Sequence, residues 1–186
     1  VQDVPLVGIT PRPAPLTISG ATGERPLRWN DDVVAWTRRV AFTSALDRSP
    51  MIFVGYGIVA PEFGWDDYKG LDVRGKTLVM LIGDPPVADH KMPGTLDPEV
   101  FGGKAMSDYG RWTYKFEIAA EKGAAGAFLV HEADAAGYAF DVVQASWSGE
   151  QFGLVEPDRG RHRPAVEGWL SYGATLDLFR AAGAAR

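Results

Sequence analysis

One stretch of the chain, residues 108–132, constrains the fold more than any other, because it joins a helical pattern to a glycine and then to an apolar run. Apolar residues recur there at three- and four-residue spacing, which places them on one helical face: Tyr109, Trp112, Phe116, Ala119 and Ala120. Asp108 is suited to cap the start of this helix, and Gly123 can adopt the left-handed conformation that ends one. Residues 126–130 then have the length of a buried strand. We therefore expect a helix that returns its apolar face directly onto a central strand.

Further strands are expected on both sides of this unit. Runs of β-branched and aromatic residues predict them at residues 4–9, 16–19, 32–42, 51–60, 76–82 and 165–170. Gly55 and Gly57 in the fourth run indicate a bulge or a close backbone approach. A helical turn is expected at 141–147, and Ser171 should cap a last helix to residue 182, with Leu176 and Phe179 facing inward. The order predicts an α+β domain, a small mixed β-sandwich or open β-barrel with two or more flanking helices.

Proline and glycine divide the chain into an arm, one domain and a long loop. Three prolines between residues 11 and 15 fix the backbone and remove donors, so residues 1–15 should form an extended arm and residues 16–186 a single domain. The 22 glycines and 13 prolines are dispersed, which argues against a helical bundle. Residues 84–103 lack any periodicity and form the longest expected loop. Loops of this length in a compact domain are often functional.

Charge and hydropathy exclude some partners. The net charge is −5 and no basic stripe is present, so a nucleic-acid partner is not expected. The one basic run, residues 159–163 (RGRHR), is interpreted as a solvated loop, with an anion or partner contact as the alternative. No apolar run approaches the ~20 residues that span a membrane, so no membrane partner is expected. The start of the chain lacks a signal pattern, and the absence of cysteine excludes disulfide and thiolate chemistry.

No catalytic motif is evident. A catalytic zinc site needs three converging ligands, but His90, His131 and His162 are widely separated and none belongs to a metal-binding motif. We interpret His131, at the end of the buried strand, as a structural or edge residue, with a pH-sensitive contact as the alternative. Ser148 lacks the glycine two residues earlier that a nucleophile elbow requires. We predict no catalytic residue, no cofactor-binding residue and no metal ligand in this chain.

Two weaker signals stay open. Loop aspartates at positions 66, 67, 72, 84 and 89 are compatible with a calcium site, but they lack the alternate spacing of an EF-hand loop and also suit ordinary turns. Tyr109, Arg111 and Trp112 follow the long loop, where exposed aromatic and arginine side chains would suit a binding surface. These three residues form our candidate interaction surface, with a place in the core as the alternative for the aromatic side chains.

Three segments resemble a known family. They are FVGYGIVAPEFGWDDYKGLDVRGKTLVMLIGDPP, FGGKAMSDYGRWTYKFEIAAEKGAAGAFLVHE and AFDVVQASWSGEQF. Together they are similar to the protease-associated domain of bacterial zinc aminopeptidases, in the exopeptidase family that includes the transferrin-receptor and glutamate-carboxypeptidase ectodomains. The helix–glycine–strand element at 117–130 resembles the hallmark of protease-associated domains in general. The resemblance runs from about residue 4 to residue 182.

The resemblance implies a non-catalytic insert in a secreted or periplasmic zinc aminopeptidase. Such a domain would gate substrate access or contact peptide or protein, with the parent catalytic domain as its partner. The family's zinc ligands lie in that catalytic domain, and no position here matches them, so zinc is expected only in the parent. The alternative is an autonomous module that binds protein or peptide through residues 84–111.

Overall fold

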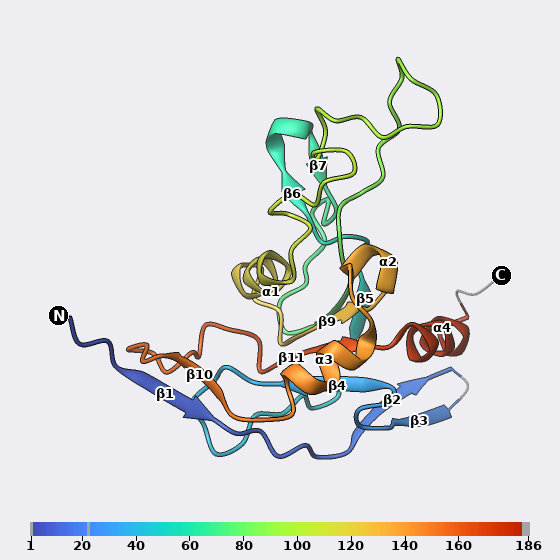
Figure 1. The fold of residues 1–186 in the computed structure, drawn as a ribbon. Helices are drawn as coiled ribbons and strands as arrows, with labels where there is room; N and C mark the ends of the chain where they lie inside the picture. Colours follow the sequence, from blue (N-terminus) through green and yellow to red (C-terminus); the bar gives the residue numbers. More distant parts are fainter. Residues whose placement is uncertain (1, 22, 184–186) are drawn as a thin grey trace.

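The structure is a computed structural model, and it describes residues 2–21 and 23–183 (Figure 1). The strands are β1 (Leu6–Ile9), β2 (Leu16–Gly20), β3 (Gly23–Leu27), β4 (Val33–Trp36), β5 (Met51–Phe53), β6 (Val59–Ala60), β7 (Trp65–Asp66), β8 (Thr77–Leu81), β9 (Gly126–Val130), β10 (Gln151–Leu154) and β11 (Val166–Leu170). The helices are a 3-10 turn η1 (Pro61–Phe63), α1 (Trp112–Glu121), α2 (Ala133–Ala136), α3 (Phe140–Ser146) and α4 (Tyr172–Ala181). The expected α+β class is confirmed.

A five-stranded mixed sheet forms the centre, in the order β4-β11-β9-β8-β5. Strands β5, β8, β9 and β11 are parallel, and β4 adds antiparallel to β11. All five residues of β9 are buried, because a strand in the middle of a sheet that is covered on both sides has no solvated face. The buried run predicted at residues 126–130 is therefore confirmed as the central strand.

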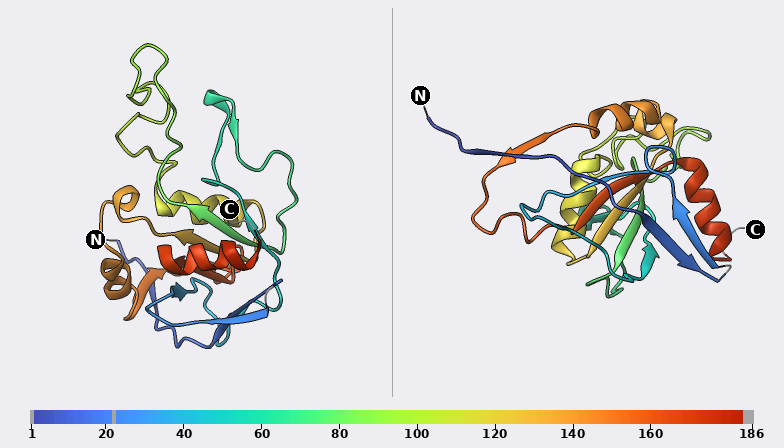
Figure 2. Two further views of the ribbon diagram at one scale, coloured as in Figure 1. Left: turned by 90° about the vertical axis from the view of Figure 1, so that its right-hand side faces the viewer. Right: turned by 90° about the horizontal axis from the view of Figure 1, so that it is seen from below.

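Alternating residues of the sheet pack into two separate hydrophobic cores. One face carries Val34, Leu78, Met80, Leu129 and Trp169, which pack against α1 and α3. The opposite face carries a second set that packs under the β2–β3 hairpin and α4: Val33, Ala35, Val79, Phe128, Val130 and Leu170. The strand period of two sends neighbouring residues to opposite faces. The result is a layer of helices, the sheet, and a layer made by the hairpin and α4 (Figures 1 and 2).

Two parts project from this three-layered body. The first, which we call the protruding lobe, consists of residues 56–67 and 84–110 and rises at the top of Figure 1. It has its own small core of Ile58, Ala60 and Phe101, with several aromatic rings packed around them. The second is the two-stranded ribbon of β1 and β10, which lies to one side of the body, next to the N-terminus (Figures 1 and 2). Both parts place side chains away from the main sheet.

The main helix begins later than expected. Helix α1 starts at Trp112 with Arg111 as its N-cap, and no side chain caps it. Asp108 instead pairs with Arg111 at 3.2 Å, because the segment before the helix is a series of turns held by Ser107 and Asp84. The prediction that Asp108 caps the helix is therefore wrong, whereas Gly123 does adopt a left-handed φ of 73° after it.

Other predicted elements are shorter or divided. Residues 51–60 form two strands in different sheets, because Gly55 and Gly57 have φ values of 60° and 64° and turn the chain between them. A Cβ on Gly57 would lie 2.5 Å from the Met80 sulfur, so the expected close approach is present. The strand predicted at 32–42 ends at Trp36. Strands β3, β7 and β10 and helix α2 were not predicted.

The last helix largely follows the prediction. Ser171 is its N-cap and its hydroxyl accepts a hydrogen bond from the Ala174 amide at 3.3 Å. Phe179 packs edge-on against Phe53. Leu176, however, is 38% exposed, so its inward orientation was predicted wrongly. No helix among the described residues has both the length and the apolar character needed to cross a membrane.

Candidate functional site

The three residues of the candidate interaction surface lie in three different environments. The Tyr109 hydroxyl donates to Glu62 at 2.6 Å in the protruding lobe, and this bond raises the pKa of Tyr109 to about 12. Arg111 is largely exposed and pairs with Asp108. Trp112 packs edge-on against Phe116 and is partly buried in the main core. Of the three, Trp112 borders a recess.

That recess has a volume of ≈ 270 Å³ and lies where α1, α3, β10 and β11 meet. It is lined mainly by aromatic and branched side chains: Trp112, Tyr138, Val142, Val143, Ser146, Trp147, Gln151 and Trp169. The ring of Trp147 stacks on Trp36 at 3.6 Å between centroids, and Trp112 meets Trp147 edge-on at 5.7 Å. These contacts fix the indole walls through packing against the core. We call this feature the aromatic recess.

A buried lysine connects the body to the protruding lobe. Lys115 of α1 is fully buried, and its Nζ donates to the carbonyl oxygens of Tyr56 at 2.6 Å and of Gly83 at 3.1 Å. Burial lowers the pKa of Lys115 to about 7, against the opposing effects of Asp84 and Asp67. Asp84 in turn accepts from the amide and hydroxyl of Ser107. The Lys115 side chain therefore links Tyr56, which follows β5, to Gly83, which follows β8, at the two points where the chain enters the protruding lobe.

His131 lies inside the body, at the end of β9. It is 3% exposed and surrounded by the rings of Tyr138, Phe140 and Trp169. Its Nε2 has no hydrogen-bond partner among the described residues. Burial lowers the pKa of His131, because a charged imidazole is disfavoured in this apolar surrounding. The position fits the structural role expected for this histidine.

The carboxylates of the loop aspartates accept hydrogen bonds within the chain, and that of Asp84 reaches Ser107, 23 residues along the sequence. Asp66 accepts from the amides of Tyr68 and Lys69, and Asp67 accepts from the Ile58 amide and the Trp65 indole. The carboxylates of the other three bond to nearby groups in the same way: Asp72 to Arg74, Asp84 to Ser107 and Asp89 to the Lys91 amide. Their oxygens are thus used by the chain itself, as is usual for turn aspartates.

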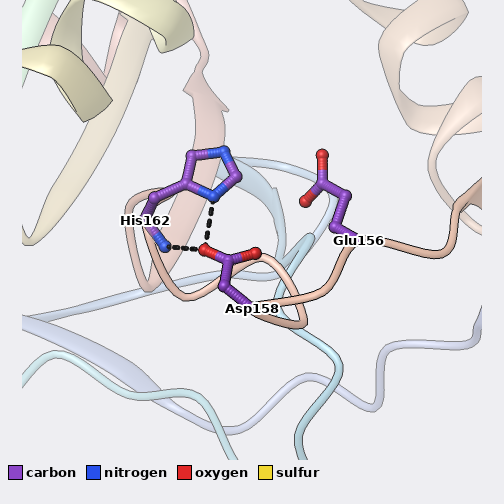
Figure 3. Close-up of side chains that lie close together, drawn as sticks. All are labelled: Glu156, Asp158 and His162. Carbon is purple, nitrogen blue, oxygen red and sulfur yellow. Dashed lines mark hydrogen bonds and ion pairs between the residues drawn. The ribbon is translucent and has the colours of Figure 1, made fainter.

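A group of three titratable side chains, which sequence reasoning missed, lies in the loop before β11 (Figure 3). Glu156, Asp158 and His162 place their ligand atoms within 4.8 Å of one another. Asp158 accepts from the His162 amide at 3.0 Å and faces its Nδ1 at 2.6 Å, and these bonds lower the pKa of Asp158 to about 2. The acid–x–acid–x₃–His spacing within residues 156–162 was the signal that could have found the group.

The surroundings of this group disfavour a metal ion. The Arg163 guanidinium donates to Glu156 at 3.0 Å, so a cation already neutralises that carboxylate. A metal on His162 Nδ1 would also have to break the short contact with Asp158. These two displacements offset much of the gain from coordination, since a metal needs free, deprotonated ligands. We interpret the group as an ion-pair network that closes the loop.

This interpretation predicts the response to zinc. We expect micromolar Zn²⁺ to leave the thermal unfolding midpoint of the chain unchanged, because a ligand stabilises only the state that binds it. The midpoint is measured by circular dichroism with and without Zn²⁺, with His162→Ala as the control. A rise in the wild-type midpoint that His162→Ala abolishes would contradict the interpretation and assign a metal site.

The β1–β10 ribbon carries apolar side chains on its outward face. Leu6 pairs with Leu154 and Gly8 with Phe152, and residues directly opposite in an antiparallel pair share a face. On this face Leu6 is 60%, Phe152 69% and Leu154 64% exposed. Val7 and Ile9, on the other face, are half-buried. The outward face of the ribbon is thus apolar, whereas a sheet with one solvated face normally carries polar side chains on that face.

Comparisons with known proteins give no relative: no family model, no curated protein and no solved structure matches the chain.

Proposed function

We propose that the chain is a non-catalytic accessory domain of the protease-associated type, which docks on the catalytic domain of a secreted or periplasmic zinc aminopeptidase. In this role it limits access of peptide substrates to the active site or contacts the peptide itself. The zinc ion and the catalytic residues belong to the partner. The observation that supports this function best is the outward apolar face of the β1–β10 ribbon.

The physical case rests on the cost of leaving that face in water. Burying one large apolar side chain is worth about 1.5–3 kcal/mol, and the ribbon exposes three of them side by side. A two-stranded ribbon is also only marginally stable by itself. Contact with another protein surface relieves both costs. Contiguous apolar patches of this kind mark protein contacts more often than scattered exposed leucines do.

The ribbon gives a direct test. We expect the double variant Phe152→Ser, Leu154→Ser to keep the stability of the domain within about 0.5 kcal/mol, since both side chains are exposed. Its affinity for the aminopeptidase catalytic domain, supplied as a separate chain, should fall about a hundredfold, as two apolar contacts are lost. Isothermal titration measures the affinity, and Leu71→Ser is the matched control because Leu71 is 53% exposed and belongs to neither strand of the ribbon.

Two outcomes would overturn the proposal. The first is unchanged affinity of the double variant. The second is hydrolysis of a leucine aminopeptide by the purified chain with added zinc, because an accessory domain has no turnover of its own.

A second candidate function is peptide or protein binding through residues 84–111. It is favoured by the small core of the protruding lobe, which holds this segment in place around Phe101. Met92 and Met106 are 61% and 41% exposed on it, and methionine side chains adapt readily to different partners. If Met92→Ser weakens binding of a partner while the ribbon variant does not, the lobe is the binding surface.

A further inference from the structure

The aromatic recess differs from an ordinary surface hollow in the hydrogen bonds at its rim. Ser146 donates its hydroxyl to the Val142 carbonyl at 2.7 Å. The amide nitrogen of Gln151 donates to the carbonyls of Ser146 at 2.9 Å and of Gly149 at 3.5 Å. The donors of both side chains are therefore used within the chain. What the rim offers is the remaining acceptor capacity of the Ser146 hydroxyl and of Gln151 Oε1, to which no described residue donates.

The walls of the recess select a flat apolar group. Trp112, Trp147 and Tyr138 contribute ring surface, with the buried Trp169 behind them, and aromatic rings pack well edge-on or offset against such surfaces. A volume of ≈ 270 Å³ is below the range of ordinary small-molecule pockets, so the recess suits one ring system rather than a larger ligand. Val142, 46% exposed, forms part of the lining on the solvent side.

The charge nearby argues against a cationic ligand. The Arg38 guanidinium lies over the Trp112 ring at 5.6 Å and is paired with the buried Glu167 at 3.4 Å. The electron-rich face of this indole is therefore already engaged by a cation. A second cation on Trp112 would also be repelled by the Arg38 guanidinium. A neutral ring avoids this cost.

We propose that the aromatic recess binds the side chain of a tyrosine or tryptophan in a peptide or protein, with the ring packed against the aromatic wall and its O–H or N–H donated to Gln151 Oε1 or Ser146 Oγ. Gln151 also begins β10 and pairs with Ile9, so the recess borders the ribbon whose outward face is apolar. The inference rests on the proposed function for its biological meaning, because it names the side chain that a peptide contact would recognise.

The test uses the full chain and two small probes, N-acetyl-tyrosinamide and N-acetyl-phenylalaninamide, titrated to millimolar concentration. The indole N–H signals of Trp112, Trp147 and Trp169 in a ¹H–¹⁵N spectrum report binding. We expect the tyrosine probe to shift these signals and to bind about fivefold more tightly than the phenylalanine probe, as one hydrogen bond would give. Gln151→Met should reduce this preference, because it removes one of the two acceptors.

Two variants of α3 separate the recess from the rest of the surface. Val142→Arg places a long charged side chain at the recess and should weaken binding of the tyrosine probe at least tenfold. Ala145→Arg is the matched control, since Ala145 is exposed on the same helix but does not line the recess, and it should change the affinity less than twofold.

The proposal is overturned if the tyrosine probe leaves the three indole signals unshifted, or if tetramethylammonium shifts them more strongly than the tyrosine probe does. It is also overturned if Val142→Arg and Ala145→Arg bind the tyrosine probe with equal affinity. None of these results depends on Phe152 or Leu154, the side chains that the ribbon test changes, because neither lines the recess. Failure of the ribbon test with intact probe binding would refute the proposed docking role alone, whereas failure of the probes would refute only the recess.

Discussion

Gly168→Val is expected to lower the free energy of unfolding by about 4 kcal/mol or more, a loss that marginally stable domains rarely tolerate. Gly168 lies in β11, between Ala35 of β4 and Phe128 of β9. A Cβ at this position would lie 2.6 Å from the Val34 carbonyl oxygen and 2.9 Å from both the Ala35 Cβ and a Phe128 ring carbon. The carbonyl belongs to the backbone of the neighbouring strand, so it cannot move away without disturbing the pairing of β4 with β11.

Urea unfolding followed by tryptophan fluorescence measures this effect, and two further variants grade it. Gly168→Ala introduces only the Cβ and should cost about 1–3 kcal/mol, as overpacking of a core usually does. Gly153→Ala is the control: Gly153 is also a strand glycine, but no atom lies within 4 Å of its added Cβ, and its effect should stay within about 0.5 kcal/mol. A Gly168→Val domain as stable as the control would show that the two strands can separate at no cost.

The central sheet could be predicted because strands that are buried on both faces have a simple sequence pattern. Residues 76–82, 126–130 and 165–170 are short apolar runs between turn residues, and they became β8, β9 and β11. The N-cap at Ser171 was equally local, since a serine before a helical pattern is enough to indicate it. In each case the pattern that indicates the element lies within a few neighbouring residues, although the strands themselves pair with distant parts of the chain.

Elements that depend on distant residues could not be predicted. Strand β10 forms only because residues 151–154 meet β1, which precedes it by more than a hundred positions. Asp108 has the right residue type and spacing for a cap, but Asp84 holds the Ser107 turn and helix α1 starts only at Trp112. The tertiary contact decided where the helix begins, and a local capping rule does not include it.

The candidate sites follow the same distinction. The aromatic recess joins α1, α3, β10 and β11, so its composition was hidden, although Trp112 was singled out. No motif or pattern in the sequence indicated that Gln151 or Val142 belongs to a binding site. Lys115 did carry one: it is three residues after Trp112 and four before Ala119, on the helical face that points into the core. A lysine at such a position indicates a buried amine, and the structure places it there.

Lys115 leads to the second large effect, a dependence of stability on pH. Its buried Nζ donates to two carbonyl oxygens, those of Tyr56 and Gly83, and a neutral amine has enough N–H groups for both. Burial lowers the pKa of Lys115 to about 7 in the folded chain, whereas the ordinary lysine value is 10.5. Between these two values the unfolded chain holds a proton that the folded chain has released.

Stability therefore rises with pH through this window, because it increases wherever the unfolded state binds more protons. We expect the free energy of unfolding to climb from pH 7 to pH ~9.5 by up to about 1.4 kcal/mol per pH unit. Below pH 7 both states are protonated at this residue, and its contribution to the slope ends. Above about pH 10 the tyrosines add an opposite trend, since burial raises the pKa of Tyr68 and Tyr114 in the folded chain.

Urea midpoints across this range, for the wild type and Lys115→Met, measure the effect. The methionine variant should lose the rise, and it should also leave the two carbonyls without their donor, at a cost of about 1–3 kcal/mol. Lys104→Met, at an exposed position in the protruding lobe, should retain the wild-type slope. A flat wild-type profile would mean that Lys115 keeps its proton in the folded chain, so that an ammonium rather than a neutral amine joins Tyr56 to Gly83.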